Sequence, residues 1–153
     1  MATTLRSKSF QTNLLLSIGG IFIMFAVCFC AYQYNREKKY KIVVLHARLQ
    51  EYNHELMQSL GEEGIRSDSL FNAYTRGHRI ERMRVTIIDT DGRVLQDNDY
   101  HQVGSLPNHL QRVEVQEVLR KGSGYDIKRI SQSTHETYFY SATCFDNLVV
   151  RSA

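Results

Sequence analysis

The stretch VTIIDTDGRVLQDND, Val85 to Asp99, decides the fold because it contains two β-type runs on either side of an aspartate-glycine pair. Such a pair between apolar runs is a strong hairpin signal, since glycine accepts a positive φ and aspartate tolerates it. We therefore predict a β-hairpin that turns at Asp91 and Gly92. We also expect Asp89 to hydrogen-bond the backbone of the loop.

The same stretch contains four aspartates, so a calcium-binding loop is the alternative. An EF-hand loop requires glycine at its sixth position and carboxylates at positions one, three, five and twelve. With Gly92 at the sixth position, Asp89 and Asp91 occupy positions three and five. Ile87 and Asn98 then occupy the first and last positions, and neither is a carboxylate. The sequence therefore predicts a turn, with no metal site and no cofactor.

Three more β-type runs follow at residues 124–131, 136–143 and 147–152, all rich in Tyr, Ile, Val and Thr. Between the hairpin and these runs, Arg112 to Gly122 has the pattern of a helix that ends at a glycine. A short helix is also expected near Ser67 to Tyr74, with Ser67 or Asp68 as its N-cap. We therefore expect an α+β fold with a five-stranded antiparallel sheet.

An apolar segment near the N-terminus predicts a membrane helix at residues 14–34. Residues 9–35 contain no charged side chain, and Leu14 to Tyr32 is a nearly unbroken apolar run of 19 residues. At about 1.5 Å of rise per residue this run is roughly 28 Å long, close to the hydrocarbon core of a bilayer at about 30 Å. A cleaved signal peptide is the alternative, but its apolar core is usually about 7–15 residues and ends at a small-residue site.

A second helical pattern follows directly at residues 35–60. Its apolar stripe has spacings of 3, 4, 3, 4 and 4, close to a heptad seam, and consists of Ile42, Leu45, Leu49, Tyr52, Leu56 and Leu60. No proline interrupts residues 14–60, so we expect one long amphipathic helix that ends at the GEEG of Gly61–Gly64. The stripe has two candidate partners, a second copy of the helix or the chain's own sheet, and the pattern favours neither.

Charge and cysteine usage exclude two classes of protein. From Arg36 onward, 17 Lys and Arg stand against 16 Asp and Glu, which is too balanced for the basic face that nucleic-acid binding usually requires. Cys28 and Cys30 lie in the apolar run and Cys144 is alone beyond it, so no disulfide framework is predicted. The basic segment Arg76 to Arg84 fits either an anionic ligand or lipid headgroups, or a solvated connection, and we favour the connection.

The strand TYFYSAT provides the candidate ligand-binding residues. Tyr138 and Tyr140 alternate with Phe139 and so share one face of the sheet. Arg129 on the preceding strand lies on the same face if the register allows it. Aromatic side chains on a sheet face line ligand pockets, although they more often belong to a core. We therefore take Arg129, Tyr138 and Tyr140 as the candidate site for a small molecule or ion.

Beyond these patterns, the sequence resembles the extracytoplasmic PAS-like (Cache-type) sensor region of phosphate-regulon-type membrane sensor histidine kinases. The likeness covers the anchor and Val85 to Ala153. It lies in a D-x-D-G-x-V-L-x-D pattern followed by N-H-x-x-R-x-E. The matching residues are Asp89, Asp91, Gly92, Val94, Leu95, Asp97, Asn108, His109, Arg112 and Glu114.

The resemblance implies a layout and a role. Residues 1–13 would be cytoplasmic, and residues 61–153 would form a sensor domain outside the inner (cytoplasmic) membrane of a bacterium. The long helix would pair in a homodimer and pass a stimulus to a kinase core that binds the response regulator. That core does not appear in this sequence, so we expect a fragment or a natural truncation with no enzymatic activity of its own.

Apparent catalytic motifs do not alter this expectation. HELMQSL, His54 to Leu60, resembles a phosphoacceptor box, but Met57 and Ser59 replace its basic residue and its proline, so we expect His54 on the surface. No ATP-binding domain, phosphate-cradling loop or nucleophile–base pattern is present in the sequence. The same sensor on a chemoreceptor or a cyclic-dinucleotide enzyme is the alternative. A pilin-like subunit is less favoured, because no glutamate precedes Glu37.

The charges around the apolar run and the resemblance to sensor kinases predict opposite membrane orientations. Arg6 and Lys8 precede the apolar run, whereas four basic residues follow it, namely Arg36, Lys38, Lys39 and Lys41. The positive-inside rule alone would place the C-terminal side in the cytoplasm. We follow the resemblance and predict an extracytoplasmic sensor, because a large folded domain weakens the effect of nearby charges.

Overall fold

A computed structural model describes residues 2–78, 83–100, 102–130 and 137–153. The chain divides into two compact units, Met1–Ile42 and Val43–Ala153. The helices are α1 (Ala2–Arg66), α2 (Asp68–Gly77) and α3 (Val113–Lys121), with a single 3-10 turn η1 (Val103–Ser105) in the described residues. The strands are β1 (Val85–Asp89), β2 (Val94–Asp97), β3 (Ser123–Ile130), β4 (Thr137–Phe145) and β5 (Leu148–Ser152).

Helix α1 contains both of the helical segments predicted from the sequence. Its residue Gly61 has φ 64° and ψ 178°, outside the helical region, so the helix breaks at the first glycine of GEEG and one further turn continues to Arg66. Among the described residues, α1 is the one helix that is long and apolar enough to cross a membrane. A transmembrane role for its apolar run is therefore plausible by length and composition.

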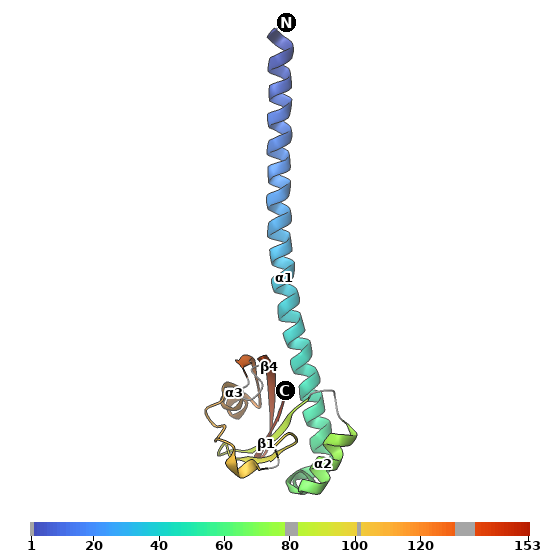
Figure 1. The fold of residues 1–153 in the computed structure, drawn as a ribbon, viewed down its shortest axis with the longest axis vertical. Coiled ribbons are helices and arrows are strands. Elements are labelled where there is room, and N and C mark those ends of the chain that lie inside the picture. Colours follow the sequence, from blue (N-terminus) through green and yellow to red (C-terminus); the bar gives the residue numbers. More distant parts are fainter. Residues whose placement is uncertain (1, 79–82, 101, 131–136) are drawn as a thin grey trace. The chain divides into compact units, whose positions relative to one another are not determined.

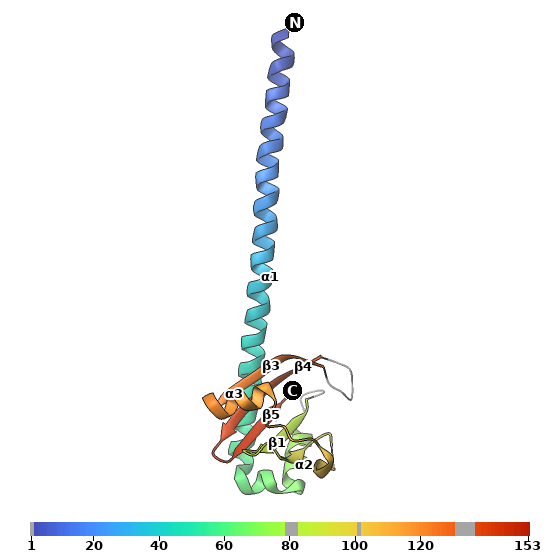
Figure 2. The same cartoon turned by 90° about the vertical axis from the view of Figure 1, so that its left-hand side faces the viewer.

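The five strands form one sheet in the order β2-β1-β5-β4-β3, and every neighbouring pair is antiparallel (Figure 2). The predicted α+β class and five-stranded antiparallel sheet are confirmed. The first and last strands lie side by side in the middle, with Val85 opposite Ser152 and Asp89 opposite Leu148. The first and last strands along the chain are therefore hydrogen-bonded neighbours, although the other three strands and α3 lie between them in the sequence.

The β1–β2 hairpin turns through Thr90, Asp91 and Gly92. The Gly92 amide donates to the Asp89 carbonyl at 2.8 Å, and the Asp89 amide donates to the Arg93 carbonyl at 2.9 Å. Gly92 has φ 80°, whereas Asp91 does not take a positive φ, so the glycine alone provides the left-handed conformation. The main chain of Asp89 makes the loop contacts, and its carboxylate accepts a hydrogen bond from the Thr90 hydroxyl at 3.1 Å instead.

Each face of the sheet packs against helices (Figure 1). The C-terminal part of α1 and helix α2 cover one face, and the core there is formed by Leu49, Tyr52, Leu56, Ile65, Phe71, Met83, Val85, Ile87, Leu148 and Val150. Burial of each large apolar side chain contributes about 1.5–3 kcal/mol. Three members of the predicted stripe, Leu49, Tyr52 and Leu56, are therefore buried in this core, and Leu60 packs against it. Leu45, one turn earlier, is 41% exposed.

Helix α3 covers the other face. Val115 and Val118 pack there on Ile88, Ala142 and Val149. The helix ends as predicted at Gly122, which has φ 80° and donates its amide to the Val118 carbonyl at 2.7 Å. The start of strand β3 approaches the helix so closely that a Cβ at Gly124 would lie 2.5 Å from the Glu114 carbonyl oxygen.

Candidate functional site

Several charged side chains lie on the face of the sheet that α3 covers. In β5, Val149 and Arg151 point to this face, and the register pairs Arg151 with Ala142 of β4. Tyr138 and Tyr140 lie on the same face of β4, with ring centroids 6.2 Å apart. Phe139 packs against the core under α1, as the alternation predicts.

The backbone register gives the strand partner of Arg129. Arg129 in β3 is directly opposite Tyr138 in β4. The side chain of Arg129 lies outside what the structure describes. Tyr140 is 5% exposed, and its ring lies 4.8 Å from the guanidinium carbon of Arg151. Burial raises the pKa of Tyr140 above its ordinary value, so its phenol stays protonated at neutral pH.

Arg151 is an ionised side chain buried in the centre of the sheet, with 3% of its surface exposed. Its Nη1 donates to Oε1 of Glu114 at 3.3 Å, and its Nη2 donates to the Thr86 hydroxyl at 3.1 Å. Burial lowers the pKa of Arg151, and the carboxylate of Glu114 opposes that shift. Because an unpaired buried charge costs several kcal/mol, Glu114 in the first turn of α3 is a structural partner of this arginine.

Asp97 is the second buried carboxylate on this face, with a side chain that is 0% exposed. The Nε of Arg84 donates to Oδ1 of Asp97 at 3.1 Å and to Oδ2 at 3.0 Å. The Nη2 of Arg84 lies 2.9 Å from Oδ2 of Asp97. The Asp97 oxygens also accept the Thr86 hydroxyl and the amides of Asp99 and Tyr100 at 2.9–3.1 Å. Burial opposes the charge of Arg84, but Asp97 raises the pKa of Arg84 above its ordinary value.

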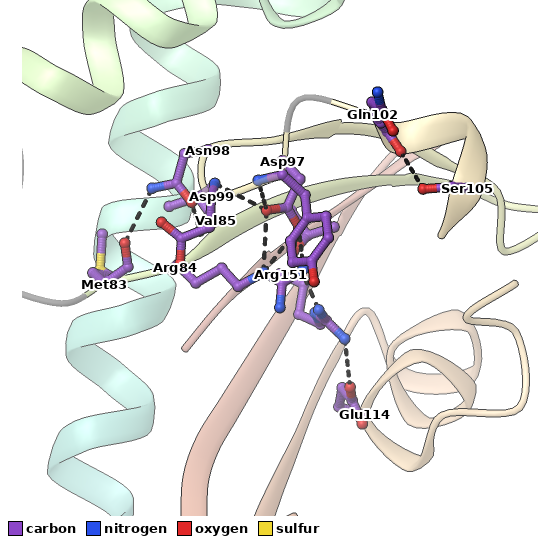
Figure 3. Close-up of polar contacts among 12 residues, drawn as sticks. Met83, Arg84, Val85, Asp97, Asn98, Asp99, Gln102, Ser105, Glu114 and Arg151 are labelled. Carbon is purple, nitrogen blue, oxygen red and sulfur yellow. Dashed lines mark hydrogen bonds and ion pairs between the residues drawn. The ribbon is translucent and has the colours of Figure 1, made fainter. Parts of the chain in front are cut away.

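Thr86 joins the two ion pairs, because its hydroxyl donates to Asp97 and accepts from Arg151. We call the joined set the charged network, and Figure 3 shows it from Arg84 to Glu114; its members are Arg84, Thr86, Asp97, Glu114 and Arg151. The network connects β1, β2 and β5 to α3. Its carboxylates are engaged by arginines, so the arrangement stabilises the packing of α3 and offers no group poised for acid–base chemistry.

His109 lies beside this network and is 4% exposed. Burial and the nearby charges of Arg151, Arg112 and Arg84 lower its pKa to about 3. Its Nδ1 has no hydrogen-bond partner among the described atoms. The imidazole is therefore neutral at physiological pH, and a ring among three arginines is unsuited to hold a cation.

The two halves of the sequence pattern that resembled sensor kinases contact each other in the fold. The His109 amide donates to the Gly92 carbonyl at 2.7 Å, and Nδ2 of Asn108 donates to the Asp91 carbonyl at 2.8 Å. A Cβ at Gly92 would collide with Asn108 and with the backbone of Leu110. The aspartate-glycine turn is thus the docking point for the loop before α3.

Other predicted features lie away from this face. His54 is exposed on α1, as predicted, with its ring 4.9 Å from that of Phe145. Arg76 is exposed on α2 and Arg84 is engaged by Asp97, so part of the basic segment is structural; its residues 79–82 lie outside the described residues. In the part of the chain that the structure describes, no three His, Cys, Asp or Glu side chains converge to hold a metal.

Sequence reasoning missed Thr86 and Arg151, and it included Arg84 only as part of the basic segment without its partner Asp97. A signal was present for Arg151, which interrupts the apolar run LVV of β5, since a charge inside a buried strand requires a partner. Nothing local identified Glu114 as that partner, because 36 residues separate the two along the chain.

Comparisons with known proteins give a fold and no family. No protein-family model matches the chain, and no curated protein matches it. Among solved structures, the Bacillus subtilis YkuI protein, described with an EAL domain in complex with its substrate c-di-GMP and calcium, matches with a TM-score of 0.55 and 14% identity. The match covers 78% of this chain and 34% of that one, so it shows a shared fold.

A second solved structure is the extracellular domain of a predicted histidine kinase, rpHK1S-Z16. It matches with a TM-score of 0.44 and 17% identity, and the match covers 56% of this chain and 36% of that one. The chain therefore spans about a third of the length of both solved structures.

Proposed function

We propose that this chain is the membrane anchor and extracytoplasmic sensor domain of a bacterial two-component sensor histidine kinase of the phosphate-regulon type. The observation that carries the proposal is the composition of α1. The helix contains the apolar run Leu14–Tyr32 and also supplies Leu49 and Leu56 to the core against β1 and β5. A change in the packing of the sheet therefore acts on the same helix that is proposed to cross the membrane.

The proposed role is transmission of a signal, with catalysis in a kinase core beyond this sequence. In this proposal residues 61–153 are a PAS-like (Cache-type) sensor outside the inner membrane. Two copies of the long helix pair, and the kinase core acts on the response regulator. Leu45 and Val43 are 41% and 64% exposed on α1, and they offer apolar surface to a second helix.

The proposed ligand surface is the one predicted from the sequence, formed by Arg129, Tyr138 and Tyr140. The strand pairing of Arg129 with Tyr138 and the 6.2 Å between the Tyr138 and Tyr140 rings support it, because aromatic rings and an arginine suit a small molecule or ion with a negative charge. The surface adjoins Arg151, whose partner Glu114 begins α3. A ligand there would shift the contact between α3 and the sheet.

Ligand binding is tested with the full chain in lipid nanodiscs. Thermal unfolding is measured against inorganic phosphate, dicarboxylates and amino acids, for the parent chain and for Arg129→Gln and Tyr138→Phe. We expect one compound class to raise the melting temperature of the parent and to lose most of that effect in both variants. Arg120→Gln, on the exposed side of α3, is the matched control and should respond like the parent. No shift from any class would contradict this surface.

A second candidate is the same sensor module on a cyclic-dinucleotide enzyme. The shared fold with the YkuI protein, which has an EAL domain, is the observation that favours it. The coding sequence after the Ala153 codon distinguishes the candidates directly. A phosphoacceptor helix and an ATP-binding domain support the kinase, whereas a cyclic-dinucleotide domain or a chemoreceptor signalling domain would replace it.

A further inference from the structure

The charge of this protein is divided unevenly between its two units. Residues 1–42 contain six Lys and Arg and one Glu, a net charge of +5. Residues 43–153 contain 13 Lys and Arg and 15 Asp and Glu, a net charge of −2. The positive excess of the chain therefore belongs to the unit with the apolar run, and the folded unit does not share it.

Most of that excess lies in a six-residue segment of α1. We call Arg36, Lys38, Lys39 and Lys41 the basic collar, and all four side chains are exposed. At about 100° per residue, Lys38, Lys39 and Lys41 lie roughly 200°, 300° and 140° around the helix from Arg36. The collar therefore presents cations on all sides of the helix. A binding face for a protein partner would instead place them on one side.

The collar is also confined along the helix axis. Arg36 and Lys41 are about 7.5 Å apart in rise, a distance comparable with the thickness of a layer of lipid headgroups. Glu37 pairs with Lys41 at 2.8 Å, while Arg36, Lys38 and Lys39 have no ion-pair partner among the described residues. Three cations are thus available for an external anion.

The neighbouring side chains match a membrane interface. Tyr32 and Tyr34, on the apolar side of the collar, are 63% and 69% exposed, and Tyr40 within it is 69% exposed. Tyrosines are enriched at the headgroup level because their rings are apolar and their hydroxyls polar. The apolar run, the tyrosines and the collar follow one another in the order that a lipid leaflet requires.

From these observations we propose that the basic collar binds anionic phospholipid headgroups in the leaflet at the C-terminal end of the apolar run. The inference rests on the proposed membrane anchor, and it goes further by assigning a lipid class to a named segment. It also gives a role to the four cations that conflict with the positive-inside count. With the sheet unit outside the cytoplasm, these cations would lie at the outer leaflet and contact its phosphates.

The test uses the full chain in bilayers of phosphatidylcholine with spin-labelled probe lipids. Electron spin resonance gives the fraction of each probe that the protein immobilises. We expect spin-labelled phosphatidylglycerol to associate about three-fold or more strongly than spin-labelled phosphatidylcholine at low salt. In about 1 M salt, where the Debye length is about 3 Å, the preference should fall close to one.

Two variants that lose equal charge separate the collar from the net charge of the chain. The collar variant combines Arg36→Gln, Lys38→Gln, Lys39→Gln and Lys41→Gln. The control variant combines Arg48→Gln, Arg66→Gln, Arg76→Gln and Arg93→Gln, which are exposed in the folded unit. We expect the collar variant to lose most of the phosphatidylglycerol preference and the control to keep it.

Three results would overturn the proposal. The first is a preference that is equal in the collar variant and the parent, and the second is a preference that survives high salt. In both cases the chain remains membrane-bound, so the proposed anchor is unaffected. The third is release of the chain from membranes by alkaline carbonate with no immobilised lipid, which would reject the anchor as well.

Discussion

At the scale of single residues, the guanidinium of Arg151 is a charge that the fold buries almost completely. It is 3% exposed in a central strand, and it lies against Glu114, Thr86 and the ring of Tyr140. Burial of a charge is unfavourable by several kcal/mol unless hydrogen bonds and an opposite charge compensate. The position of α3 is therefore tied to this one side chain.

Replacement of Glu114 by leucine should destabilise the sheet unit. The change leaves Arg151 buried beside no carboxylate of α3, and breaking one partner of such a pair costs about 3–5 kcal/mol. The measurement is chemical denaturation of the full chain in detergent micelles, followed by tyrosine fluorescence. Hydrogen exchange should also become faster in α3.

The double variant Glu114→Leu with Arg151→Met is the control for this prediction. It removes both charges and keeps similar volumes, so it should recover much of the lost stability. A double variant that is less stable than Glu114→Leu alone would contradict the assignment of Glu114 as the counter-ion of Arg151.

His109 makes the stability of the fold depend on pH. Its pKa is about 3 in the folded chain, against an ordinary value of 6.5. Between these pH values the unfolded chain binds a proton that the folded chain does not, so stability falls as pH decreases from about 6.5 toward 3. Each unit of this difference corresponds to about 1.4 kcal/mol, and the whole effect is of the order of a few kcal/mol.

The pH effect is measured as the denaturation midpoint between pH 7 and pH 4. His109→Leu should flatten the dependence over this range, because it removes the titrating group. His54→Gln removes an exposed histidine of α1 and is the matched control for the loss of one imidazole. Equal slopes for His109→Leu and the parent would contradict the buried neutral state of His109.

At the scale of elements, the contact between α3 and β3 depends on the absence of a side chain at Gly124. A Cβ there would lie 2.5 Å from the Glu114 carbonyl oxygen and 2.9 Å from the Val118 amide nitrogen. These are backbone atoms and cannot rotate away. The helix therefore packs at a distance that glycine alone permits.

Gly124→Ala should displace α3 and destabilise the sheet unit by about 1–3 kcal/mol, as overpacking in a core does. Gly104→Ala is the matched control, because a Cβ at Gly104 has no neighbour within 4 Å. Denaturation midpoints and α3 hydrogen exchange report the effect. Equal midpoints for the two variants would show that the helix moves without cost.

The elements that the sequence predicted are those that local chemistry determines. The hairpin follows from Asp91 and Gly92, and the end of α3 follows from Gly122, because each glycine provides a positive φ within a few residues of the break. The alternation of Tyr138, Phe139 and Tyr140 follows from the strand period of two. Each of these predictions needed a short window of sequence.

Long-range partners could not be predicted in the same way. The pairing of β1 with β5 and the contact of Arg151 with Glu114 join residues that are distant along the chain. The stripe on α1 was ambiguous for the same reason, since its period fits a second helix and a sheet equally well. The structure resolves this at Leu49, Tyr52 and Leu56, which pack on the chain's own sheet.

At the scale of the whole molecule, a single helix joins the apolar run to the folded unit. Helix α1 contains an apolar run suited to a bilayer and a segment that belongs to the core of a five-stranded sheet. The central claim is that this helix crosses the membrane and that residues 61–153 lie outside the cytoplasm. The charge pattern opposes this orientation, and the resemblance to sensor kinases favours it.

The most direct test is a pair of reporter fusions placed after Ala153 in a bacterial host. Alkaline phosphatase is active only outside the cytoplasm. Green fluorescent protein is fluorescent inside the cytoplasm and does not become fluorescent when it is exported as an unfolded chain. The account predicts a membrane-bound fusion with high phosphatase activity and little fluorescence. A fluorescent, membrane-bound fusion with no phosphatase activity would contradict it and would place the sheet unit in the cytoplasm.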